Sequence, residues 1–343
     1  MTTCGQCGYA SEKGFTYCPE CGTHAATAGA AGLAGRMLNG KYRVLSELGA
    51  GSMGTVYLGE HVALKKKIAL KVLHRELQLG DEPMQRFQRE GIAAGQITHP
   101  NVIQIFDFDR TDDGTCFLAM EYVEGENLKE LLAREGSLPP ETALALIRQL
   151  LQTLGEAHRH GVVHRDLKPE NLMVVQGAGE VPTLKVLDFG LSKLVDQRFD
   201  ASLQTMSGRV MGTPLYMAPE QWRGEAVDAR SDLYSVSLIL YELLTGHQPF
   251  KGRDMHEMLL RSTTEAPPSV LDQATRHPVP IDVDALLRTG LAKDREERFQ
   301  DAGEMLAAID AVRLDRVQRG SGAGRGRPAP SRTASRAGSR AGS

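Results

Sequence analysis

Aromatic residues and long apolar runs are scarce in this chain of 343 residues. Aromatic side chains make up 5% of the sequence, and Trp222 is the only tryptophan. One of the longest stretches without Lys, Arg, Asp or Glu runs from Cys21 to Gly35 and is mostly Ala, Gly and Thr, whereas a membrane-spanning helix needs about 20 strongly apolar residues. No basic stretch leads into an apolar one at the start, so no secretory signal is visible. We therefore expect a cytoplasmic protein without a membrane span.

Neither sign of charge is in large excess. The chain has 40 Lys and Arg against 43 Asp and Glu, a formal net charge of -3, which excludes a protein driven mainly by bulk attraction to nucleic acid or anionic membrane. With 41% hydrophobic residues, it can build a core of one large or two ordinary domains. Only Gly320–Ser343 departs from this balance of charge, with five Arg and no acidic residue. We expect residues 314–343 to form a disordered basic tail.

Cysteine is almost confined to the N-terminus. Two C-x-x-C pairs separated by ten residues, Cys4 with Cys7 and Cys18 with Cys21, account for four of the five cysteines. This spacing predicts one tetrahedral Zn²⁺ site, because each pair directs two thiolates at the same ion. The alternatives are a pair of disulfides or a redox C-x-x-C, and the lack of a secretory signal disfavours disulfides. The segment also resembles the short zinc ribbons at the ends of many bacterial proteins.

The chain therefore divides into a ribbon, a tether, a globular part and a tail. Residues 1–24 are predicted to form the zinc ribbon, which holds a structural Zn²⁺ and could recruit a protein partner. Lys13 is the only Lys or Arg before Arg36, so nucleic-acid binding by the ribbon is not expected. Residues 25–40 read as a flexible linker rich in Ala and Gly. Apolar periodicity is continuous over 41–313.

A glycine-rich loop, residues 49–54, lies between predicted strands at Tyr42–Leu48 and Thr55–Glu60. The G-x-G-x-x-G spacing also occurs in dinucleotide-binding folds, but those require a helix directly after the glycines and an acid about 20 residues further on. Here a β-branched strand follows, and a cation, Lys71, stands on a third predicted strand, Lys67–Leu73. The pattern therefore favours a glycine hairpin that covers phosphates.

Two helices are predicted from apolar stripes with three- and four-residue spacing. The first begins at Pro139–Glu141, where proline is tolerated in the first turn. The second runs from about Asp232 to Leu244. We assign core packing and no chemistry to the residues of these stripes, which are Leu144, Ile147, Leu151 and Leu154 in the first helix and Leu233, Val236, Leu240 and Leu243 in the second.

Three further motifs follow the glycine loop and Lys71. They are His-Arg-Asp-Leu-Lys-Pro-Glu-Asn at His164–Asn171, Asp-Phe-Gly at Asp188–Gly190, and Ala-Pro-Glu at Ala218–Glu220. Together they form the protein-kinase signature set in its expected order. Over roughly residues 41–313, the chain resembles a eukaryotic-like serine/threonine protein kinase of the bacterial type. The resemblance implies an α+β, two-lobed protein kinase fold, with a β-rich small lobe and a helical large lobe, preceded by the zinc ribbon.

The resemblance implies transfer of the γ-phosphoryl group of ATP to serine or threonine hydroxyls of protein substrates. Asp166 would orient the acceptor hydroxyl and accept its proton, and Lys168 would neutralise the γ-phosphate. Asn171 and Asp188 would hold Mg²⁺ or Mn²⁺ through hard oxygen ligands. Lysine at 168 in particular matches serine/threonine rather than tyrosine kinases.

The nucleotide pocket follows from the same resemblance. Lys71 would hold the α- and β-phosphates and pair with an acid on the following helix; Glu90 is the first choice, with Glu76 and Glu82 as alternatives. Met120 stands at the gatekeeper position between the adenine pocket and the core. The residues implied to contact ATP are Leu48, Gly49, Ala50, Gly51, Ser52, Met53, Gly54, Val56, Ala69, Lys71, Glu121, Val123 and Met173.

The activation segment, from Asp188 to Glu220, is expected to carry regulatory phosphorylation. Arg165 precedes the catalytic aspartate, and kinases with this Arg commonly use it to bind a phosphorylated loop residue. The resemblance further implies structural roles for Asp232, as a brace of the catalytic-loop backbone, and for a pair between Glu220 and Arg298. The candidate phosphorylation sites are Thr205 and Ser207, followed by Ser202.

Two other classes of function remain as alternatives. A pseudokinase scaffold would bind nucleotide or partners without turnover, although every catalytic position is present here. A nucleic-acid-binding protein led by ribbon and tail would need more basic residues than the ribbon has. The sequence gives no indication of the oligomeric state.

Overall fold

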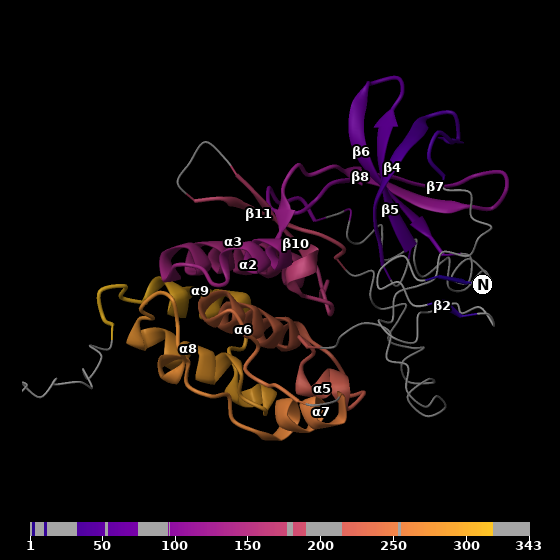
Figure 1. Cartoon of the computed structure of the whole chain (residues 1–343). Coiled ribbons are helices and arrows are strands. Elements are labelled where there is room, and N and C mark those ends of the chain that lie inside the picture. Colours follow the sequence, from indigo (N-terminus) through magenta and orange to yellow (C-terminus); the bar gives the residue numbers. More distant parts are fainter. Residues whose placement is uncertain are drawn as a thin grey trace, which may run out of the picture.

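Two lobes make up the computed structural model, a sheet-based small lobe and a helical large lobe joined by the segment after β8 (Figure 1). The structure describes residues 2–3, 10–11, 33–51, 54–74, 95, 97–176, 181–189, 215–252 and 255–317. This arrangement confirms the predicted order of a β-rich lobe followed by a helical lobe.

The small lobe is a six-stranded antiparallel sheet with the strand order β3-β4-β5-β6-β8-β7. Alternate residues of β6 point into the core of this lobe, where Ile68, Leu70 and Val72 pack with Phe117. The strands are β3 (Met37–Leu38), β4 (Tyr42–Ala50), β5 (Gly54–His61), β6 (Lys66–Leu73), β7 (Ile105–Arg110) and β8 (Cys116–Glu121).

The glycine loop lies at the end of the β4–β5 hairpin, as predicted. The amide of Gly51 donates to the carbonyl of Gly54 at 2.9 Å and closes the turn. Gly54 also has no room for a side chain, because a Cβ there would lie 2.2 Å from the carbonyl oxygen of Val72 on β6. Glycine at this position therefore lets the loop lie close over the neighbouring strand.

The predicted linker 25–40 is shorter than the sequence suggested, because its last eight residues pack on the small lobe. The amide of Gly35 donates to the carbonyl of Val44 at 2.8 Å, and Leu38 in β3 is fully buried. The guanidinium of Arg36 binds Asp113 at 2.6 Å. Low apolar content hid these contacts, since they are made by backbone groups, by the Arg36 side chain and by two leucines, Leu33 and Leu38. Residues 25–32 lie outside the described residues.

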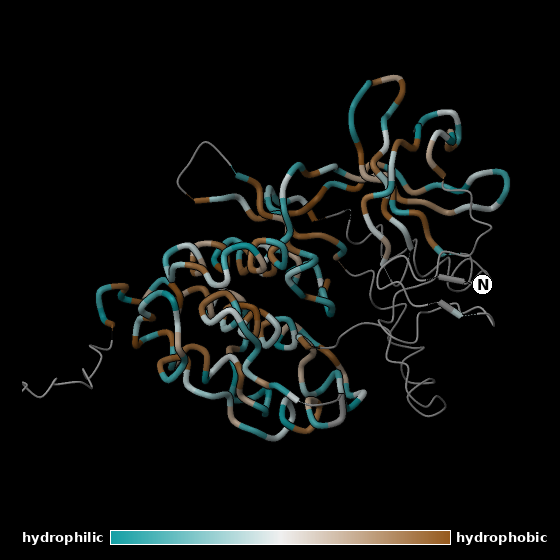
Figure 2. The backbone as a smooth tube through the Cα atoms, viewed as in Figure 1, coloured by the Kyte–Doolittle hydropathy of each residue, from teal (hydrophilic) through white to brown (hydrophobic). Residues whose placement is uncertain are grey.

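The large lobe is organised around α6 (Ala229–Thr245), whose residues are buried on nearly every side. Figure 2 shows hydrophobic residues gathered where the helices of this lobe face one another. The helix begins three residues before the predicted start, because the Asp228 side chain caps it by accepting from the Arg230 amide at 2.9 Å. Against it pack α3 (Pro140–Arg159), α8 (Ile281–Gly290) and α9 (Ala302–Asp310).

Smaller elements complete the large lobe. A three-stranded sheet, β9 (Glu126–Asn127), β10 (Leu172–Val175) and β11 (Thr183–Val186), adjoins the catalytic motifs, with β10 in the centre. The remaining helices and 3-10 turns are α2 (Leu128–Glu135), η2 (Pro169–Asn171), α5 (Pro219–Trp222), α7 (Met255–Thr264), η3 (Val270–Asp272) and η4 (Arg295–Glu297).

The ends of the chain are described in part. Residues 314–317, predicted as the start of the tail, belong to the large lobe, because the Ile281 amide donates to the Arg316 carbonyl at 2.8 Å and Arg316 binds Asp282. Residues 318–343 lie outside the described residues. At the N-terminus, β1 (Thr2–Thr3) pairs antiparallel with β2 (Ala10–Ser11). Among the described residues, no helix is long and apolar enough to cross a membrane.

Candidate active site

The catalytic loop is held by a carboxylate from the core helix α6. Oδ2 of Asp232 accepts from the amide of His164 at 2.8 Å, and Oδ1 accepts from the amide of Arg165 at 2.9 Å. Oδ2 also meets Nε2 of His158, near the end of α3, at 2.8 Å. Asp232 therefore fixes the backbone just before Asp166 and is a structural brace, as predicted.

Asp166 lies beside the two residues that the motif places after it. Nζ of Lys168 is 2.7 Å from Oδ2 of Asp166, and Nδ2 of Asn171 donates to the carbonyl of Asp166 at 2.7 Å. The Asp166 carboxylate is 47% exposed, so a substrate hydroxyl can reach it. The loop thus places a carboxylate, an ammonium and an amide together at the surface of the large lobe.

Lys71 of β6 reaches across from the small lobe to Asp188. The distance from Nζ to Oδ2 is 2.6 Å, and the Lys71 side chain is 8% exposed. Burial alone would raise the pKa of the Asp188 carboxyl, but the Lys71 ammonium, with His164 and Lys168 nearby, holds this pKa below its usual range. The carboxylate therefore stays charged and available to bind cations.

The backbone of Asp188 is left-handed, with φ of 56°. This conformation is uncommon for a residue with a Cβ and marks functional sites. Phe189, the next residue, is buried and meets the His164 ring edge-on, with centroids 4.9 Å apart. The His164 ring in turn hydrogen-bonds the carbonyl of Leu187 at 2.9 Å. The residues on both sides of Asp188 are thus held by His164, Leu187 through its carbonyl and Phe189 through its ring.

The side chains at Asp188 and Asn171 fit the predicted Mg²⁺. Asp188 supplies a carboxylate, and because Nδ2 of Asn171 donates to the loop backbone, the side-chain oxygen of Asn171 is left for a hard cation. Within the described ranges no three His, Cys, Asp or Glu side chains gather as a metal site. Mg²⁺ usually takes only one or two protein carboxylates and completes its shell with water and substrate phosphates.

The predicted adenine pocket is apolar where the structure describes it. Ala69 and Met120 are buried next to each other on paired strands, with Val56 and Val123 packed against them. Met173 lies in β10 and is half-buried, whereas Leu48 is 48% exposed. The carboxylate of Glu121 pairs with Lys185 at 2.9 Å. These positions stay predictions for nucleotide contact.

Several predicted site residues lie outside the described residues. They are Ser52 and Met53 of the glycine loop, the acid candidates Glu90, Glu76 and Glu82, the phosphorylation candidates Ser202, Thr205 and Ser207, and the cysteines Cys4, Cys7, Cys18 and Cys21. The partner of Lys71 in the described residues is Asp188, not one of these acids.

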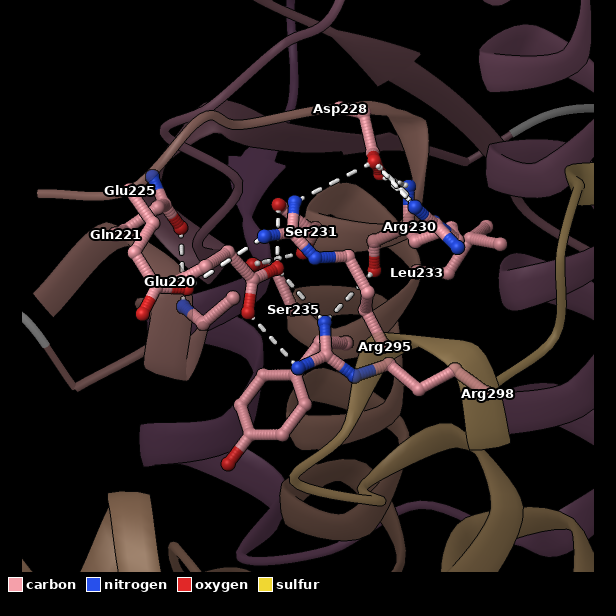
Figure 3. A network of polar contacts seen from close by, with 12 residues as sticks. Glu220, Gln221, Glu225, Asp228, Arg230, Ser231, Leu233, Ser235, Arg295 and Arg298 are labelled. Carbon is pink, nitrogen blue, oxygen red and sulfur yellow. Dashed lines mark hydrogen bonds and ion pairs between the residues drawn. The ribbon is translucent and has the colours of Figure 1, made fainter. Parts of the chain in front are cut away.

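Glu220 and Arg298 form the predicted structural pair, shown in Figure 3. Nη1 and Nη2 of Arg298 each lie 2.8 Å from one carboxylate oxygen of Glu220, and both side chains are almost fully buried. Burial would raise the pKa of Glu220, but hydrogen bonds from Arg298 and Ser231 lower it below its usual range. The pair fixes the end of the activation segment to the large lobe.

Some contacts around this site have no signal in the sequence motifs. His158, near the end of α3, lies outside the motifs, yet its ring meets Asp232. Gln221, directly after Ala-Pro-Glu, donates to the carbonyl of Arg165 at 2.8 Å. No motif predicts that the Tyr216 hydroxyl donates to the Glu242 carboxylate at 2.5 Å either. A motif spacing shows the order of residues in the chain, and none of these partners is close in sequence.

Comparisons with known proteins agree with this geometry. A family profile described as "Protein kinase domain" matches residues 42–308. Serine/threonine-protein kinase pkn3 of Myxococcus xanthus is 40% identical over 282 residues, which cover 82% of this chain and 52% of that protein. Serine/threonine-protein kinase PrkC of Bacillus subtilis (strain 168) is 34% identical over 287 residues, which cover 82% of this chain and 43% of that protein.

A solved structure shows the same fold. The crystal structure of the PknI kinase domain from Mycobacterium tuberculosis aligns with a TM-score of 0.62 and 29% identity, over 81% of this chain and 99% of that one. The chain spans about half, or less, of the length of the two curated relatives. The profile, the relatives and the site geometry together show that the chain belongs to the protein kinase family and carries a kinase domain of the bacterial serine/threonine type.

Proposed function

We propose that this chain is an active serine/threonine protein kinase that transfers the γ-phosphoryl group of ATP to protein hydroxyls and acts in signalling. The observation that carries the proposal is the joint placement of Asp166, Lys168 and Asn171 on one loop, braced by Asp232, with Lys71 and Asp188 paired beside it. A scaffold without turnover would not require this complete set of charged groups.

The residues have separate roles in the transfer. Asp166 accepts the proton of the acceptor hydroxyl. The hydroxyl oxygen bonds to the γ-phosphorus as the bond from that phosphorus to the β,γ-bridging oxygen breaks. Lys168, 2.7 Å from Asp166, lies where it can stabilise charge on the transferred group. Lys71 orients the α- and β-phosphates. Mg²⁺, held by Asp188 and Asn171 when bound, neutralises phosphate charge.

Transfer to protein can be measured with the purified chain, ³²P-labelled ATP, Mg²⁺ and a generic basic protein, followed by analysis of the labelled amino acids. We expect label on serine and threonine in the wild type and almost none with Asp166→Asn. Label on tyrosine would contradict the substrate class. Absence of transfer, with Mg·ATP still bound, would favour the scaffold.

We further propose that phosphorylation in the activation segment raises activity. Support comes from Arg165 beside the catalytic aspartate, since a phosphate carries nearly two negative charges and pairs with arginine. Thr205 and Ser207 are the first candidates and Ser202 the third. We expect mass spectrometry of the active chain to find phosphate on these residues, and the Thr205→Ala/Ser207→Ala variant to lose most activity. A fully active double variant would contradict the proposal.

For the N-terminal segment, we propose a zinc ribbon that recruits a protein partner. Support comes from the spacing of Cys4, Cys7, Cys18 and Cys21, and from the antiparallel pairing of β1 with β2 on either side of the first pair in sequence. Metal analysis should give one Zn²⁺ per chain, lost in the Cys4→Ser/Cys18→Ser variant. Generic kinase activity should survive this loss, because the described contacts that dock residues 33–40 on the small lobe are made within that lobe.

A further inference from the structure

The carbonyl that precedes the catalytic aspartate is held by a side chain from a different element. Nε2 of Gln221, in α5, donates to the carbonyl of Arg165 at 2.8 Å. Oε1 of the same side chain accepts from the amide of Ala218 at 3.0 Å. One amide group therefore caps the start of α5 and contacts the catalytic loop, and each of its two polar atoms has a different partner.

The helix that carries Gln221 is firmly anchored. Its neighbour Glu220 makes the two 2.8 Å bonds to Arg298 and accepts from Oγ of Ser231 at 2.5 Å (Figure 3). Arg298 also donates to the carbonyls of Ala292 and Lys293 at 2.8 and 3.1 Å. Because Glu220 and Gln221 are adjacent, the buried pair fixes the point from which Gln221 reaches the loop.

The loop residue that Gln221 contacts is in a conformation that needs support. Arg165 has φ of 69°, in the left-handed region, which is costly for a residue with a Cβ. Its amide is bound by Asp232 at 2.9 Å and its carbonyl by Gln221 at 2.8 Å. The Arg165 carbonyl and the Asp166 amide nitrogen belong to the same planar peptide group. Rotation of this peptide group would therefore move the Asp166 carboxylate.

We propose that Gln221 is a positioning residue for Asp166: by holding the Arg165 carbonyl, it fixes the peptide that orients the catalytic carboxylate. The inference rests on the proposed kinase function. It also gives the segment before α5 a direct route to the catalytic loop, because any shift of α5 is transmitted through Gln221 to the residue before the base.

Two substitutions separate positioning from capping. Gln221→Glu keeps an oxygen that can accept from the Ala218 amide but replaces the donor to Arg165 with a second oxygen. Gln221→Met removes both contacts at similar size. We expect both variants to lower kcat roughly 10- to 100-fold, because small misplacements of a catalytic group have effects of this size, with KM for Mg·ATP within about twofold of wild type, since the nucleotide contacts lie elsewhere.

The pH profile gives a readout that a purely structural role would not change. Protonation of the new carboxyl in Gln221→Glu restores a donor toward the Arg165 carbonyl. The ratio of its kcat to the wild-type kcat should therefore rise as pH falls from 8 to 5.5, while the ratio for Gln221→Met stays flat. As a matched control, Asp301→Ala removes the cap that the Glu304 amide uses in α9. It should lower Tm by a few degrees and leave kcat unchanged.

Wild-type kcat in Gln221→Glu, or losses of kcat in both variants that follow Tm and do not respond to pH, would overturn the inference and leave capping as the only role of Gln221. Failure of the proposed function is distinguishable, because the wild type itself would then transfer no phosphate, and the inference would fall with it. Mg·ATP binding to each variant, measured by thermal shift, shows that the compared proteins are folded.

Discussion

Two ion pairs in this kinase domain differ in how completely they are enclosed. Glu220 and Arg298 lie inside the large lobe, with side chains 3% and 0% exposed, and share two bonds of 2.8 Å. Lys71 and Asp188 lie between the lobes, with side chains 8% and 27% exposed, and share one contact of 2.6 Å. The first pair is almost fully enclosed, whereas the Asp188 carboxylate of the second is partly exposed.

The difference assigns the two pairs to different tasks. Arg298 has further backbone acceptors, so its charge is satisfied without a ligand. Lys71 and Asp188 are each expected to contact another charged species, phosphate and Mg²⁺ respectively, and a single contact is easily exchanged. We infer that the Glu220–Arg298 pair stabilises the fold. The Lys71–Asp188 pair keeps a cation and an anion in place to bind phosphate and Mg²⁺.

The largest effect on stability should come from breaking the closed pair. Arg298→Met leaves the Glu220 carboxylate buried without its partner, which should lower the free energy of unfolding by about 3–5 kcal/mol. Chemical denaturation measures this change. In the double variant Glu220→Leu/Arg298→Met no charge is left uncompensated, so part of the loss should be recovered. A double variant less stable than Arg298→Met would contradict this interpretation.

Breaking the open pair should affect catalysis more than stability. Lys71→Met removes a cation from the phosphate site, and phosphate transfer should fall by roughly 100-fold or more, as for other charge-stabilising groups. Its Tm should change less than that of Arg298→Met. Lys67→Met is a matched control on the same strand, because Lys67 pairs with Glu124 in an exposed contact. It should keep wild-type transfer.

A truncation tests how far the small lobe depends on the N-terminal segment. Deletion of residues 1–38 removes β3 and Leu38, whose burial contributes about 1.5–3 kcal/mol. Deletion of residues 1–32 keeps these contacts and serves as the control. We expect the longer deletion to lower Tm clearly and the shorter one to leave it nearly unchanged. Equal Tm values would show that residues 33–38 are a tether after all.

The smallest expected effect is a pH dependence next to the closed pair. Burial and the nearby charge of Arg298 lower the pKa of Lys293 to about 7, from 10.5. Between these values the unfolded chain binds a proton at this lysine and the folded chain does not, so stability should rise with pH. The wild-type minus Lys293→Met difference in unfolding free energy should increase from pH 6.5 to 9. A flat difference would contradict the lowered pKa.

Part of the fold and site was predictable because motifs and periodicity are local. The strands around the glycine loop and the helices α3 and α6 follow from apolar spacing, and Asp166, Asn171 and Asp188 follow from short motifs. The link from Gln221 to Arg165 spans 56 residues and uses a single glutamine without a spacing pattern. The docking of residues 33–40 depends on backbone bonds, which leave little trace in composition.

Single-turnover phosphate transfer, with Mg·ATP affinity measured on the same samples, tests the central claim most directly. For Asp166→Asn we predict affinity within a few-fold of wild type and transfer at least roughly 100-fold slower, because Asp166 acts on the acceptor hydroxyl and not on the nucleotide. Wild-type transfer by Asp166→Asn, or no transfer by a wild-type chain that binds Mg·ATP, would contradict the account.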